Sequence, residues 1–114
     1  MPFINVKTNA KLSDEQKKNI ENKLSDAISL IPGKSDRYLM LAVEDEISMM
    51  FHRDSDSRIA MVEVKIFGSS TKDAYTSLTA EICDILSNEA DISGSNCYVK
   101  FEEVALWGYN GFMF

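Results

Sequence analysis

Cysteine, histidine and proline are scarce in this sequence of 114 residues, which contains two cysteines, two prolines and one histidine. Cys83 and Cys97 stand 14 positions apart, with no Cys-x-x-Cys motif and no companion histidines. We therefore expect buried free thiols instead of a disulfide or a zinc site. The single histidine, His52, falls within the charged segment 52–58, whose composition predicts a solvated loop. Neither a metal centre nor a glycine-rich phosphate loop is indicated, so no cofactor is expected.

Positive charge is also scarce, because 12 Lys and Arg residues stand against 18 Asp and Glu residues and the formal net charge is −6. Proteins that bind nucleic acid or anionic membranes use clustered Lys and Arg side chains. The only adjacent basic pair, Lys17-Lys18, has acidic residues on both sides, so neither kind of partner is expected. No run of 18 or more apolar residues predicts a membrane span. Because no signal peptide is recognisable, we expect a cytoplasmic protein, and export without such a signal stays open.

The patterns that are present describe two β-α-β units in one domain spanning residues 1–114. Hydrophobic residues make up 45% and charged residues 26% of the sequence, which is typical of a globular domain. Alternating or continuous apolar runs predict four strands, at residues 2–8, 38–43, 59–67 and 97–101.

Each unit also contains one predicted helix. Ser13–Gln16 has the form of a capping box, and Ser70–Asp73 repeats its spacing. Apolar side chains then recur at helical intervals, over residues 20–31 in the first unit and residues 75–86 in the second. Pro32-Gly33 is expected to end the first helix.

The two units predict an α+β fold with two layers. Right-handed crossovers place both helices on one face of a single four-stranded mixed sheet. Both faces of this sheet look apolar, although only two helices are available to cover them. The tail, residues 106–114, is apolar as well and carries four aromatic side chains. We therefore expect other subunits to cover the second face and the tail, with a tail folded back on its own core as the alternative.

Pro2 is the residue with the clearest chemical potential. Removal of Met1 would leave a free secondary amine at the start of the first strand, and an exposed α-amino group titrates at about 7.7–8.0. Burial or a nearby cation lowers this pKa, and an amine that is neutral near pH 7 is a competent general base. Lys34 could supply the cation and bind a substrate carboxylate. The residues alone leave open that Pro2 merely follows the initiator and that Lys34 caps the first helix.

Five segments resemble the macrophage migration inhibitory factor and D-dopachrome tautomerase family: Pro2, Gly33-Lys34, Ile66-Phe67-Gly68, Tyr98 and Trp107–Phe114. The resemblance covers the whole chain, including its length and the doubled β-α-β plan. It implies a tautomerase-superfamily fold and a homotrimer, with three active sites at the subunit interfaces. It also implies an isomerase that needs no cofactor.

The resemblance implies a role for individual residues. Pro2 corresponds to the catalytic base, Lys34 to the lysine that pairs with the substrate carboxylate, and Phe67 to the residue whose backbone N–H contacts the substrate. Lys100 stands where the mammalian relatives place an asparagine, and it would add positive charge if it points into the pocket. The other side chains implied to form the pocket are aromatic, with the first from a neighbouring subunit: Tyr98, Tyr38, Trp107, Tyr109 and Phe114.

The function expected from this resemblance is keto–enol tautomerisation of small aryl α-keto acids of the phenylpyruvate or dopachrome type. One alternative is a trimeric, cytokine-like interaction protein with vestigial catalysis, for which receptor binding is conceivable and unsupported by any motif. Another is an isomerase of a ring-cleavage product such as a hydroxymuconate derivative. The Cys-x-x-Cys motif of the mammalian cytokine is absent from the matching residues 57–62, so thiol-disulfide oxidoreductase activity has no support.

Overall fold

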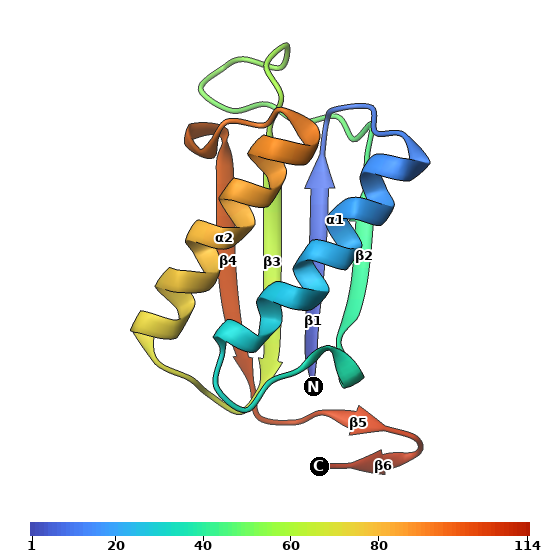
Figure 1. Cartoon of the computed structure of the whole chain (residues 1–114), viewed down its shortest axis with the longest axis vertical. Coiled ribbons are helices and arrows are strands. Elements are labelled where there is room, and N and C mark those ends of the chain that lie inside the picture. Colours follow the sequence, from blue (N-terminus) through green and yellow to red (C-terminus); the bar gives the residue numbers. More distant parts are fainter.

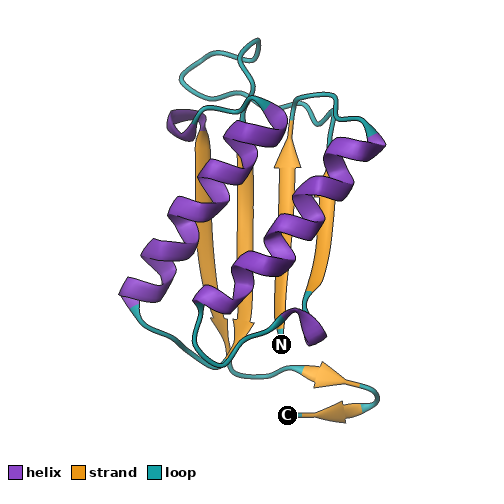
Figure 2. Ribbon diagram, in the orientation of Figure 1, coloured by secondary structure: helices purple, strands orange, loops and turns teal.

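Two helices cover one face of a four-stranded sheet (Figures 1 and 2). The computed structural model describes residues 1–114. Its strands and helices confirm the predicted α+β fold with two β-α-β units: β1 (Pro2–Thr8), α1 (Asp14–Ala27), β2 (Met40–Glu44), β3 (Ala60–Phe67), α2 (Lys72–Ala90) and β4 (Cys97–Val104). A short hairpin of β5 (Gly108–Tyr109) and β6 (Phe112–Met113) follows. Neither helix combines the length and the apolar character that crossing a membrane requires.

The sheet has the strand order β2-β1-β3-β4. The strands of each unit pair in parallel, and the antiparallel pair β1/β3 joins the two units. Because β1 and β3 run in opposite directions, the first residue of β1 lies beside the end of β3, and Pro2 pairs with Ile66. The topology thus brings the amino end of the chain to the place where the second unit turns from strand to helix.

The helices begin with side-chain caps. Ser13 accepts a hydrogen bond from the Gln16 N–H, and the Gln16 side chain accepts one from the Ser13 N–H, which confirms the predicted capping box of α1. The prediction for α2 is wrong by one residue, because Thr71 is its cap. The N–H of Ser70 is instead directed out of the helix, where it donates to the Tyr75 hydroxyl at 3.0 Å.

Other predicted boundaries also differ from the structure, and β4 continues three residues beyond the predicted 97–101. α1 ends at Ala27, and the 3-10 turn Ile28–Leu30 intervenes before Pro32-Gly33. β2 begins at Met40, because Tyr38 belongs to a second 3-10 turn, Asp36–Tyr38. The Ser35 side chain accepts a hydrogen bond from the Arg37 N–H and stabilises this second turn.

The two faces of the sheet have different chemistry. The face under the helices is apolar, with Ile4, Val64 and Ile66 fully or almost fully buried. The prediction that the opposite face is apolar too is wrong for its middle rows, which form a charged ladder. Lys100 Nζ lies 2.9 Å from Glu102 and 3.4 Å from Glu63 there. Strict alternation along β1, β3 and β4 explains this difference, because every second side chain points away from the helices.

Candidate functional site

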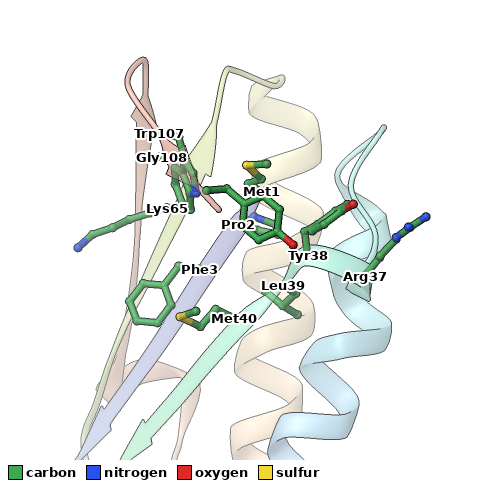
Figure 3. A pocket seen from close by; sticks show the side chains of 11 residues that line it. Met1, Pro2, Phe3, Arg37, Tyr38, Leu39, Met40, Lys65, Trp107 and Gly108 are labelled. Carbon is green, nitrogen blue, oxygen red and sulfur yellow. The ribbon is translucent and has the colours of Figure 1, made fainter. Parts of the chain in front are cut away.

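A mostly apolar cavity of about 720 Å³ opens at the end of the sheet where β1 begins (Figure 3). Pro2, Tyr38, Trp107 and Tyr109 line it, and all four were predicted to be site residues. They come from the start of β1, the turn before β2, and the tail. The fold thus gathers segments that lie far apart in the sequence into one hollow.

Aromatic side chains form one wall of the cavity. The rings of Tyr38 and Tyr109 meet edge to face, with centroids 5.6 Å apart. Phe114, which does not itself line the cavity, is stacked on Tyr109 at 6.4 Å and lies 6.1 Å from Phe67. The Phe114 N–H donates to the Trp107 carbonyl at 2.9 Å, which closes the tail hairpin. This wall fits an aromatic ring better than a polar chain.

The peptide group of Phe67 lies beside the amino end of the chain. Its N–H donates to the Met1 carbonyl at 3.0 Å, and its carbonyl accepts from Lys34 Nζ at 2.9 Å. Gly33, in the left-handed region with a φ of 81°, turns the chain directly before Lys34. Lys34, Phe67 and the residue before Pro2 are therefore in mutual contact.

The electrostatic environment at this end of the chain disfavours a charged amine. The pKa of the Met1 amine is lowered from its ordinary value, first by burial and then by the charge and hydrogen bond of Lys34. No carboxylate lines the cavity, and the charged side chains that line it, Arg37 and Lys65, are cationic. An amine in this place thus loses its proton more readily than an exposed one, and the charged side chains that line the cavity beside it are cationic.

Five predicted site residues do not line the cavity: Lys34, Phe67 and Phe114 lie next to its lining residues, and Tyr98 and Lys100 lie elsewhere. Tyr98 is at the start of β4, near the opposite end of the sheet, where its ring packs 4.9 Å from that of Phe51. Lys100 belongs to the charged ladder, and its pKa is raised by a hydrogen bond to Glu102 and by Glu63. Neither side chain lines the cavity of its own protomer.

The sequence motifs did not identify several residues that line the cavity, among them Phe3, Met40 and Arg37. Phe3 and Met40 face each other across β1 and β2. Their pairing follows from the strand register, which no local motif records. The Arg37 guanidinium lies 5.3 Å from the centre of the Tyr38 ring, and Figure 3 shows it directed away from the cavity.

The sequence matches the model of the family described as macrophage migration inhibitory factor over residues 1–114. The chain belongs to this family. None of the curated proteins matches the sequence significantly.

Solved structures with the same fold include members of this family. MIF2 of Leishmania major superposes with a TM-score of 0.93 at 23% identity, covering 100% of this chain and 97% of that one. The macrophage migration inhibitory factor-like protein of Entamoeba histolytica gives 0.88 at 26% identity, with coverages of 99% and 98%. The symmetric trimer of Q0 fused 4-OT gives 0.85 at 16% identity, with coverages of 97% and 94%. The match to family members thus extends over the entire length of the chain.

Proposed function

We propose that residues 1–114 form a single tautomerase domain that interconverts the keto and enol forms of small aryl α-keto acids, of the phenylpyruvate or dopachrome type. The general base is the nitrogen of Pro2, which becomes a secondary amine when Met1 is removed. The observation that carries this proposal is the position of Pro2 in an apolar cavity beside Lys34, where the neighbouring amine has a lowered pKa. No cofactor is required for this chemistry.

The neutral amine of Pro2 takes a proton from the carbon next to the keto group of the substrate. The electron pair of that C–H bond moves to the keto oxygen, which then receives the proton and becomes the enol hydroxyl. Lys34 binds the substrate carboxylate and opposes the negative charge that develops on the oxygen. The N–H of Phe67 is a second donor to the substrate, and donors held in place in advance stabilise such charge effectively.

The aromatic wall has two roles in this proposal. Tyr38, Trp107, Tyr109 and Phe114 accept the aryl ring of the substrate by apolar and edge-to-face contacts. They also exclude water from the Pro2 nitrogen, which disfavours its protonated form and keeps its pKa low. The exposed side chains of Phe112 and Met113 extend the same hairpin beyond the cavity.

The position of Tyr98 supports a homotrimer. Its ring is 61% exposed and lies near the end of the sheet opposite to Pro2, so it reaches a Pro2 cavity only when it comes from another copy. We assign it to the neighbour's pocket. Lys100 is on the same strand, and we assign it to the same neighbouring pocket. Two carboxylates already compensate its charge. The trimer of Q0 fused 4-OT, which has a similar fold, agrees with this assembly.

An assay that follows the conversion of enol-phenylpyruvate to its keto form by ultraviolet absorbance tests the proposal. Protein shown by intact mass to lack Met1 is expected to accelerate this conversion, and the Pro2→Gly variant is expected to lose most of this activity. Undetectable turnover by correctly processed protein would overturn the proposal. That result would favour the alternative, a cytokine-like interaction protein whose exposed apolar hairpin binds a partner.

A further inference from the structure

We propose that a residue retained in front of Pro2 blocks substrate binding as well as catalysis, because it occupies the groups that hold the substrate. This inference rests on the proposed function and adds a control step to the same site. The blocking residue in this chain is Met1, and its contacts show which groups it takes.

The backbone of Met1 continues the sheet by one residue. Pro2 has no N–H and pairs with Ile66, and the next hydrogen bond of the ladder runs from the Phe67 N–H to the Met1 carbonyl, with a length of 3.0 Å. A ladder bond of this kind fixes the position of Met1 beside the end of β3. The one N–H proposed to bind the substrate is therefore already satisfied.

The amine of Met1 is partly buried near Lys34. It lies within hydrogen-bond reach of Lys34, whose Nζ also donates to the Phe67 carbonyl at 2.9 Å. Burial and the charge of Lys34 lower the pKa of this amine, as expected for a group held inside the site. The side chain of Met1 lines the cavity together with Pro2 (Figure 3). While Met1 is in this place, its amine competes with a substrate carboxylate for Lys34.

Removal of Met1 consequently changes two properties. It converts the Pro2 nitrogen from an amide into a basic amine, which restores catalysis. It also frees the Phe67 N–H and the approach to Lys34, which restores binding. If the only effect of Met1 were to make the Pro2 nitrogen a non-basic amide, protein that retains Met1 would bind ligand normally without turning it over.

Binding of an unreactive ligand separates these two cases. Chains that retain Met1 are made while methionine aminopeptidase is inhibited, and half of the sample is then treated with this enzyme. Calorimetry with 3-phenylpropionate, which has the aryl ring and carboxylate but no keto group, compares the two forms. We expect the form that retains Met1 to bind about ten- to hundredfold more weakly, the usual effect of losing hydrogen bonds to a charged group. Equal affinities would overturn the inference.

Two further measurements make the result unambiguous. Processed Pro2→Gly protein should bind 3-phenylpropionate like the processed wild type, because its Phe67 N–H and Lys34 are equally free. Hydrogen exchange at the Phe67 N–H should be slow with Met1 and faster without it, and equally slow exchange in both forms would contradict the inference. Failure of the processed wild type to bind would instead overturn the proposed function, and the inference with it.

Discussion

The two ends of the sheet are built for different tasks. At the end where β1 begins, a turn, a strand start and the tail enclose a cavity of about 720 Å³ beside Lys34. At the other end, Met50, Phe51 and Tyr98 line an apolar hollow of about 120 Å³, and residues of the segments 9–11, 46–49 and 55–58 line a more polar one of about 570 Å³. The first end has room for a small molecule beside an amine whose pKa is lowered. At the second end Met50 and Tyr98 are exposed, and in the proposed trimer they contact a neighbouring copy.

The largest effect is expected at the first end, from Pro2→Gly in processed protein. Turnover should fall about 10²- to 10⁴-fold, the usual contribution of general acid–base catalysis. The fold should persist, because Pro2 makes no backbone donor bond that the variant would lose. Enol-phenylpyruvate decay measures the first effect and thermal unfolding the second. Unchanged turnover would remove the proline mechanism.

Lys34→Met is expected to lower kcat/KM about ten- to hundredfold, because the substrate carboxylate loses a charged hydrogen-bond donor. Most of the change should appear in KM. Lys65→Met is the matched control, since Lys65 also lines the cavity while its side chain points away in Figure 3. If both variants lost the same activity, general positive charge and not Lys34 itself would be responsible.

At the second end, Tyr98→Ala is expected to lower activity about two- to tenfold through the loss of one aromatic contact. The decisive step is to refold this variant together with Pro2→Gly. Sites that combine the Pro2 of one chain with the Tyr98 of the other then carry both native residues, so activity should exceed the mean of the two variants. A mixture that shows only the mean would place Tyr98 outside the active site.

Lys100→Asn should change turnover less than Tyr98→Ala does, by under about threefold. The reason is that Glu102 and Glu63 already pair with the Lys100 ammonium at the sheet surface, where such pairs contribute little. The same enol assay measures it. A loss as large as that of Lys34→Met would show that Lys100 leaves these carboxylates to bind substrate.

Cys97, the first residue of β4, has no role in the proposed reaction, and its thiol is expected to react only slowly. Cys83 and Cys97 are free, and the pKa of Cys97 is raised to about 12, first by burial and then by Cys83. At pH 8 its reactive thiolate form should be much rarer than that of an exposed cysteine. Iodoacetamide labelling followed by mass spectrometry should therefore leave Cys97 unmodified in native protein and modify it in urea. Rapid native labelling would show that this end is open to water.

Local signals in the sequence were sufficient for the two helices and the four strands of the main sheet, but not for the tail hairpin of β5 and β6. Alternation predicted β1, and Ser13 with Gln16 predicted the start of α1, because both depend on neighbouring residues. Contacts between residues that lie far apart in the sequence could not be predicted from such local signals. Tyr38 was placed in a strand because it adjoins an apolar run, while a hydrogen bond from Arg37 N–H to Ser35 makes a turn there.

The candidate site shows the same limit. Pro2 and Lys34 were identified by their chemistry and by the family resemblance. The contact of Met1 with Phe67 was not, since it requires the register of β1 against β3. The charged ladder was missed for a related reason, because the apolar content of each strand was considered without asking which face each side chain occupies.

The titration of the Pro2 nitrogen tests the central claim most directly. In protein that lacks Met1 and carries ¹⁵N-labelled proline, the nitrogen shift can be followed against pH. The account predicts a pKa below the ordinary α-amino value, because burial and Lys34 act on this amine as they do on that of Met1. It also predicts that Lys34→Met raises this pKa. A nitrogen that titrates at the ordinary value of about 7.7–8.0, with no response to Lys34→Met, would contradict the account.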